Sequence, residues 1–198
     1  MKILSIIIGI LLALFYIAQL YITNSTKKTE EQPYKVIQKD GDFEIRFYPS
    51  ATMATVTSSA KSYKELGNAG FRKLAGFIFG GNDANKQIAM TAPVHMDIND
   101  SISTMSFVMP ANYDEKSLPK PNDPNVKLSK TDDEYAAVLQ FSGFASDKKI
   151  EQQTMQLKAL LKANKILPYG NYRYLGYNPP YQLFDRKNEI IVSIQWQN

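Results

Sequence analysis

The stretch of sequence that decides the fold is Lys86-Gln87-Ile88-Ala89-Met90-Thr91-Ala92-Pro93-Val94. Its apolar and β-branched residues predict a β-strand that follows a helix. Proline has no N–H to donate to a sheet, so such a strand must lie at an edge, at a bulge or at its own end. Ala92, directly before the proline, is also directed toward an extended conformation. We therefore expect this strand to shape the sheet, and not to carry chemistry.

The composition is that of one globular domain with an appendage: 198 residues, 44% hydrophobic and 21% charged. Cysteine is absent, which excludes disulfides, thiolate metal sites and thiol nucleophiles. The single histidine, His95, excludes any mechanism that needs two imidazoles from this chain. The net charge of +4 comes from scattered lysines, many beside acids, so we expect solvated faces and no nucleic-acid partner.

The amino-terminal segment is apolar. Residues 3–22 carry no charge and are long enough to cross a bilayer as a helix. A cleaved signal peptide is the alternative, although its apolar core usually has only ~7–15 residues. We interpret residues 1–23 as a single-pass transmembrane anchor with the lipid bilayer as its partner, and residues 24–33 as a polar tether. Lys2 nearly balances Lys27 and Lys28, so the positive charges do not assign a side of the membrane.

The folded domain, residues 34–198, begins with a predicted hairpin. Two strand patterns flank Asp40-Gly41, a strong turn signal. In the second strand Phe43, Ile45 and Phe47 alternate with more polar residues at 44, 46 and 48. This alternation predicts one buried face and one face in water.

Two helices follow from capping and periodicity. Ser62-Tyr63-Lys64-Glu65 is a capping box, and the helical pattern after it ends at Gly80-Gly81. Gly67 and Gly70 lower helix stability, which indicates that something approaches closely there. Ser146 can cap a second helix, whose predicted inner face is Ile150, Thr154, Leu157 and Leu161.

One order of elements occurs twice: a strand, a helix and then two strands. Two such β-α-β-β units predict an α+β fold with one curved sheet or barrel and both helices packed on it. Pro179-Pro180 interrupts the last strand pair, and we interpret it as the counterpart of Ala92-Pro93 in the second repeat. No glycine-rich phosphate loop follows a strand, which disfavours nucleotide-binding folds.

Two groups of side chains are candidates for chemistry. His95 and Asp97 share one face of a strand, but two or three ligands make a poor metal site and no serine elbow accompanies the histidine. We therefore expect no metal site, no catalytic residue and a partly exposed His95. The second group contains aromatic residues near two prolines, and it fits either a cleft for a flat ligand or half-buried strand tyrosines. Its members are Tyr172, Tyr174, Tyr177, Tyr181 and Phe184.

Four motifs, in this order along the chain, resemble those of a known protein family. They are Met90-Thr91-Ala92-Pro93-Val94, Phe107-Val108-Met109-Pro110, Gly176-Tyr177-Asn178-Pro179-Pro180 and Arg186-Lys187-Asn188-Glu189-Ile190. Together they resemble the SOUL heme-binding protein family over residues 34–196. The resemblance implies a distorted antiparallel β-barrel made of two β-α-β-β repeats with two long helices. It also implies non-covalent binding of heme or another tetrapyrrole in an apolar cleft between the helix at 62–79 and the loop at 178–188.

The resemblance also suggests which side chains form the site. Phe71, Leu74, Tyr177, Tyr181 and Phe184 are expected around the macrocycle, and Arg72, Lys73 and Arg186 toward the propionates. His95 falls on none of the family motifs, so we expect no protein axial ligand. The predicted protein is thus a membrane-anchored, non-enzymatic tetrapyrrole binder. An effector-binding or scaffold module for another amphipathic ligand or a protein partner is the alternative, motivated by the glycine-containing helix.

Overall fold

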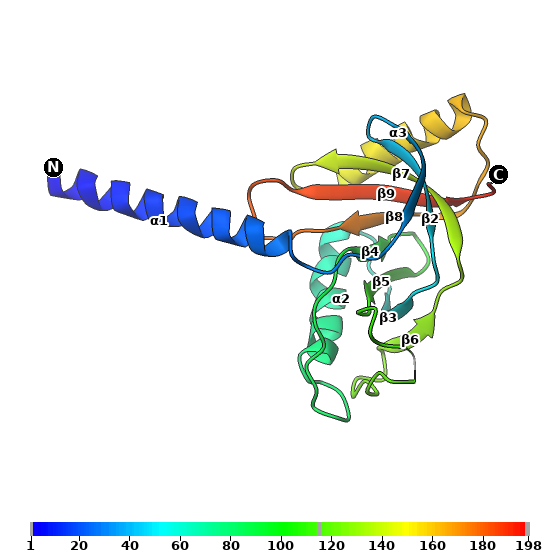
Figure 1. The fold of residues 1–198 in the computed structure, drawn as a ribbon, viewed down its shortest axis with the longest axis horizontal. Coiled ribbons are helices and arrows are strands. Elements are labelled where there is room, and N and C mark those ends of the chain that lie inside the picture. The colour runs from blue at the N-terminus through cyan, green and yellow to red at the C-terminus, as the bar shows by residue number, and fades with distance from the viewer. Residues whose placement is uncertain (1, 115, 197–198) are drawn as a thin grey trace.

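The computed structural model describes residues 2–114 and 116–196, and Figure 1 shows one apolar helix that projects from an α+β domain. The elements in chain order are α1 (Lys2–Thr26), β1 (Lys35–Asp40), β2 (Phe43–Tyr48), β3 (Thr52–Ser58), α2 (Tyr63–Ile78), β4 (Val94–Asp97), β5 (Ser103–Val108), β6 (Lys127–Lys130), β7 (Glu134–Ser142), α3 (Asp147–Ala163), β8 (Pro168–Gly176) and β9 (Lys187–Ile194). By length and composition α1 can cross a membrane, and a signal sequence near an N-terminus would pass the same test.

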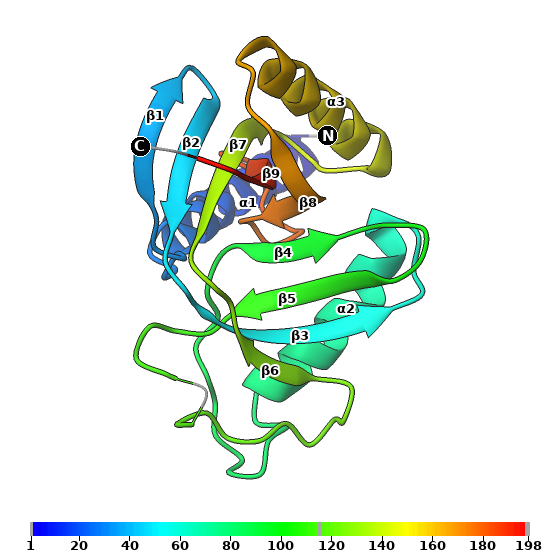
Figure 2. The same ribbon diagram turned by 90° about the vertical axis from the view of Figure 1, so that its right-hand side faces the viewer.

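The strands form one nine-stranded sheet in the order β1-β2-β7-β9-β8-β4-β5-β3-β6, with every neighbouring pair antiparallel. Figure 2 shows the sheet bending so that the strands near β7 run across those near β5. The predicted α+β class and antiparallel sheet are confirmed. The predicted barrel is not seen as a closed structure, because β1 and β6 are the outer strands of the sheet that the described residues form.

The two predicted repeats are present. The first contains β3, α2, β4 and β5, and the second contains β7, α3, β8 and β9. In each repeat the last strand lies between the other two, as β3-β5-β4 and β7-β9-β8. The repeats meet where β4 pairs with β8, with His95 opposite Leu175. This arrangement is an approximate two-fold relation between the repeats.

Two expectations about proline were wrong. Residues 86–93 do not form a strand, since β4 begins at Val94 and only isolated bridges join Gln87 to Phe79 and Ala92 to Glu31. Pro93, which follows a cis peptide bond, stands immediately before β4 and has no N–H for the sheet. Pro168 also stands at the beginning of a strand, as the first residue of β8. Pro179-Pro180 lies instead in the connection from β8 to β9.

Both helices cover one face of the sheet. Ser62 Oγ accepts from the Glu65 N–H at 3.3 Å, which confirms the predicted cap of α2. Leu157 and Leu161 of α3 are buried in the core, as predicted. A Cβ at Gly70 would lie 3.1 Å from Met105 Cβ, whereas Gly67 has nothing within 4 Å. The expected close approach to α2 is therefore confirmed at Gly70 alone.

Candidate functional site

The β8–β9 connection, residues 177–186, is held in shape by its own polar contacts. Arg186 Nη1 donates to the carbonyl oxygens of Pro179 at 2.8 Å and Gln182 at 2.6 Å. Gln182 Nε2 donates to the Phe184 carbonyl at 2.7 Å, and the Lys187 N–H donates to Asn178 Oδ1 at 2.7 Å. These bonds satisfy irregular backbone that has no strand partner. The β8–β9 loop is therefore a built surface with a defined conformation.

This loop presents apolar side chains outward over buried polar atoms. Tyr181, Leu183 and Phe184 are 63%, 41% and 45% exposed. Arg186 of the same loop is buried, with its guanidinium 4.4 Å from the centre of the Phe144 ring. Arg186 Nε and Gln182 Oε1 are buried and make no hydrogen bond to any described residue. One N–H of a cationic side chain thus lacks an acceptor in a loop that exposes aromatic rings, and this combination suits a flat ligand that carries a carboxylate.

An aromatic contact connects β8 to the start of α2. The Tyr63 ring packs edge-on against Tyr174 with ring centres 5.3 Å apart, and the Tyr174 hydroxyl donates to Asn188 Oδ1 at 2.7 Å. Burial raises the pKa of Tyr174, the neighbouring Tyr63 raises it further, and the charge of Arg186 opposes the rise. Tyr174 therefore stays protonated as a neutral hydrogen-bond donor behind the loop.

The predicted site residues divide into two groups. Phe71, Arg72, Lys73, Tyr181 and Phe184 are exposed, whereas Leu74, Tyr177 and Arg186 are buried. Phe71 packs edge-on against Phe107 with ring centres 5.3 Å apart. The loop brings Tyr181, Phe184 and Arg186 together.

Two of the buried residues point elsewhere. Leu74 is fully buried in the core beneath α2. The Tyr177 hydroxyl donates to Glu189 Oε2 at 2.7 Å on the sheet face that the helices do not cover.

That uncovered face contains a buried charge network, where the sequence predicted a face in water. Arg46 is 1% exposed, and its guanidinium donates to both carboxylate oxygens of Glu189 at 2.9 and 3.0 Å. Arg46 Nε also donates to Glu44 Oε2 at 2.6 Å, and Nη1 donates to the Tyr48 hydroxyl at 3.0 Å. The Tyr34 ring lies 4.1 Å from the Arg46 guanidinium carbon. Glu44, Arg46 and Tyr48 are thus buried, because groups distant in sequence pair with them.

The charges in this network hold one another ionised. Burial works to lower the pKa of Arg46, but its hydrogen bonds to Glu189 and the Glu189 charge raise it overall. Burial works to raise the pKa of Glu44, and hydrogen bonds from Lys39 and Arg46 lower it overall. A buried charge is tolerated when it is paired in this way. The network therefore connects β2 to β9 across the intervening β7.

His95 is on the same uncovered face and is buried, so the expectation of a partly exposed residue was wrong. Its Nε2 lies 2.8 Å from Gln32 Oε1. Burial and the nearby charge of Arg173 lower the pKa of His95 to about 3, so the ring is neutral at physiological pH. The Gln32 contact occupies Nε2, and the face of β4 that carries His95 is opposite to α2 and α3.

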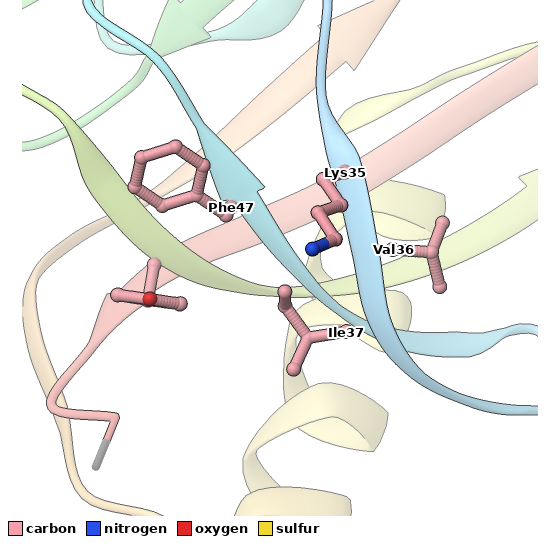
Figure 3. Close-up of a pocket in the computed structure, with 5 residues that line it drawn as sticks. Lys35, Val36, Ile37 and Phe47 are labelled. Carbon is pink, nitrogen blue, oxygen red and sulfur yellow. The ribbon is translucent and has the colours of Figure 1, made fainter. Parts of the chain in front are cut away.

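A shallow hollow of about 500 Å³ lies over β1, β2 and β7 and is shown in Figure 3. It is lined by Lys35, Val36, Ile37, Phe47 and Tyr135. None of these residues belongs to the predicted site.

The chain is similar in sequence and in fold to known proteins. A family model described as SOUL heme-binding protein matches residues 29–193. Heme-binding protein 2 from Mus musculus is 28% identical over 166 residues, which are 80% of each chain. Heme-binding protein 1 from Sus scrofa is 25% identical over 172 residues, 81% of this chain and 90% of that one. A crystal structure described as a hydrolase from Listeria innocua is similar with a TM-score of 0.57, at 11% identity, and covers 80% of this chain and 94% of that chain. At that identity the likeness concerns the fold alone.

Proposed function

Because the chain belongs to the SOUL heme-binding protein family, we propose that it is a membrane-anchored protein that binds heme or another tetrapyrrole reversibly and without catalysis. The observation that carries the proposal is the buried, unpartnered Nε of Arg186 in the same loop that exposes Tyr181 and Phe184. A tetrapyrrole has a flat apolar ring for the aromatic side chains and carboxylates for the guanidinium. The names of the similar mouse and pig proteins describe binding, which supports a binding role here.

The proposed contacts come from the β8–β9 loop and from α2. Tyr181, Phe184 and Phe71 would pack against the ring. Arg186 would meet a propionate, with Arg72 and Lys73 as further cations. Arg72 and Lys73 are exposed and form no ion pair within the part of the chain that the structure describes.

Buried Leu74 would support the α2 wall from behind, whereas the Tyr177 side chain is on the opposite sheet face and would take no part. His95 is unsuited to ligate an iron in this cleft, because it is buried on the opposite sheet face and its Nε2 is engaged by Gln32. We therefore expect the macrocycle and its carboxylates to supply most of the affinity.

The membrane anchor is α1, which we propose is retained. Its last turns make specific contacts with the folded domain: Gln19 bonds to the β8–β9 loop, and Lys27 pairs with Asp185 at 3.1 Å. The segment after it also contacts the domain, since Lys187 pairs with Glu31 at 3.1 Å. A segment that is removed on maturation has no need of such contacts.

The test is a titration of the full chain in lipid nanodiscs with hemin and, separately, with metal-free protoporphyrin, followed by absorbance and by protein fluorescence. Empty nanodiscs correct for pigment that dissolves in lipid. We expect saturable binding with similar dissociation constants for both pigments. The absence of saturable binding below about 100 μM, which corresponds to only ~5.5 kcal/mol, would overturn the proposal. Hemin binding far tighter than protoporphyrin would overturn the absence of an axial ligand.

A further inference from the structure

The end of α1 and the β8–β9 loop are joined through the side chain of one buried glutamine. Gln19 is 4% exposed, although α1 is otherwise largely open. Its Oε1 accepts from the Leu183 N–H at 2.9 Å, and its Nε2 donates to the Tyr181 carbonyl at 3.2 Å. Figure 1 shows the loop beside the C-terminal turns of α1. Both ends of the amide are therefore bonded to irregular backbone of the loop.

Two side-chain contacts on either side of Gln19 extend this junction. Toward the N-terminus, the Tyr16 and Phe184 rings meet edge-on with centres 6.3 Å apart. Toward the C-terminus, Lys27 Nζ lies 3.1 Å from Asp185 Oδ2, and both side chains are exposed. The junction thus changes from aromatic to ionic along the helix axis.

The depth of this junction in a bilayer follows from helix geometry. If residues 3–22 fill the hydrocarbon layer, Gln19 lies ~4.5 Å inside its boundary and Tyr16 ~9 Å inside, at ~1.5 Å rise per residue. Lys27 then lies ~7.5 Å outside, among the headgroups. Lysine is suited to the headgroups. The ionic contact of the junction therefore falls at the depth that suits it, and the aromatic contact lies on the hydrocarbon side of the boundary.

Hydrogen bonding gives an independent reason to place the end of α1 and the β8–β9 loop at this depth in the bilayer. A glutamine amide at that depth, or irregular loop backbone beside it, is costly unless its polar groups are bonded within the protein. Gln19, Leu183 N–H and Tyr181 C=O satisfy one another. The loop can therefore expose apolar side chains to lipid while its bonded backbone groups stay inside.

We propose that Tyr181, Leu183 and Phe184 form a second membrane contact, inserted among the acyl chains just inside the headgroup boundary. The inference rests on the retention of α1 as an anchor, which is part of the proposed function. The occupant of the exposed apolar surface is the bilayer, because that surface is continuous with the apolar surface of α1. The tetrapyrrole cleft then has one wall in contact with the membrane, and an amphipathic ligand dissolved in lipid reaches it from the bilayer.

The absence of cysteine makes a direct test simple. Single variants Tyr181→Cys and Phe184→Cys of the full chain are labelled with an environment-sensitive fluorophore and reconstituted in phosphatidylcholine vesicles. Nitroxide lipids, with the spin label either just below the headgroup or near the end of the acyl chain, quench according to depth. Ile10→Cys on α1 reports whether the anchor spans the bilayer. Leu167→Cys, 70% exposed just before β8, is the matched control in the domain.

We expect the Tyr181→Cys and Phe184→Cys labels to be quenched by the shallow nitroxide more than by the deep one, and Leu167→Cys by neither. If Ile10→Cys is quenched by the deep nitroxide while the two loop labels resemble Leu167→Cys, loop insertion is overturned and the anchor stands. If Ile10→Cys is also unquenched, both are overturned. Loop labels that are shielded from water without lipid quenching would assign the surface to a second copy of the chain and overturn the proposal. No pigment is present, so failure of tetrapyrrole binding is a separate result.

A second variant tests the role of Gln19. Gln19→Leu keeps α1 apolar and removes both bonds to the loop. We expect quenching of the Phe184→Cys label to fall toward that of Leu167→Cys, while the Ile10→Cys label stays as deep as before. Unchanged quenching at Phe184→Cys would overturn the assignment of Gln19 as the residue that sets the depth of the loop.

Discussion

Ser106 in the first β-α-β-β repeat and Glu189 in the second occupy equivalent positions. His95 and Leu175 face each other where the repeats meet, His95 is opposite Ser106, and Leu175 is opposite Glu189. Among the described residues, the Ser106 hydroxyl pairs with the Thr55 hydroxyl at 2.8 Å, whereas Glu189 binds the buried guanidinium of Arg46. One backbone plan therefore holds a neutral pair in one repeat and a charge network in the other.

The connection between the last two strands also differs between the two repeats. In the first repeat, residues 98–102 form a short turn in which Asn99 Oδ1 accepts from the N–H groups of Ser101 and Ile102. In the second, residues 177–186 form the β8–β9 loop that contacts α1. The features shared by the repeats build the sheet, and the proposed site takes its loop from what only the second repeat has.

The largest change in the free energy of unfolding is expected when the second repeat is made to resemble the first. Glu189→Ser leaves the Arg46 cation buried and without its bidentate partner, so we expect the free energy of unfolding to fall by about 3–5 kcal/mol. Urea unfolding in detergent micelles, followed by Trp196 fluorescence, measures it. Ser106→Ala is the matched control and should cost about 1 kcal/mol. Equal losses in the two variants would contradict the inequality between the repeats.

The second-largest change in stability is expected from His95, which faces its counterpart Leu175 where the two repeats meet. The pKa of His95 is about 3 in the folded state, below its ordinary value of 6.5. Between these values the unfolded chain binds a proton that the folded chain does not, so stability falls as pH falls through that window. The loss reaches about 3 kcal/mol at roughly pH 4, at ~1.4 kcal/mol per pH unit.

His95→Leu should remove this part of the pH dependence and keep the part that comes from the carboxylates. The measurement is urea unfolding of both proteins from pH 7 to pH 4. Parallel curves for wild type and variant would show that His95 does not titrate as described.

The smallest change in stability is expected from the helix glycines, which α2 contains and α3 does not. Gly67→Ala should stabilise the protein by about 0.5–1 kcal/mol, because alanine favours the helix and the new Cβ meets nothing within 4 Å. Gly70→Ala should gain less or destabilise, because its Cβ would lie 3.1 Å from Met105. Thermal unfolding of the two variants gives the comparison. A larger gain from Gly70→Ala would mean that α2 can move away from the sheet.

Local signals were enough to predict much of the fold. The caps at Ser62 and Ser146, the turn at Asp40-Gly41 and the repeated order of elements all appear in the structure. These features depend on neighbouring residues, which a single sequence displays.

The errors came from distant partners. The strand with Glu44 and Arg46 reads as half exposed, and only Glu189, 143 positions away in the chain, explains why that face is buried. Likewise, nothing near Gln19 in the sequence indicates that it bonds to the β8–β9 loop. The alternation of polar and apolar residues in a strand does not say whether a second layer covers its polar face.

The central claim is that the β8–β9 loop of the second repeat binds the tetrapyrrole, and one matched titration tests it most directly. Hemin is titrated into nanodiscs that hold the wild type, the double variant Tyr181→Ser with Phe184→Ser, or Ile102→Ser. Ile102 is 59% exposed in the corresponding connection of the first repeat. The account predicts that the double variant weakens hemin binding at least about tenfold, or ~1.4 kcal/mol, and that Ile102→Ser leaves it unchanged. Equal dissociation constants for all three proteins would contradict it.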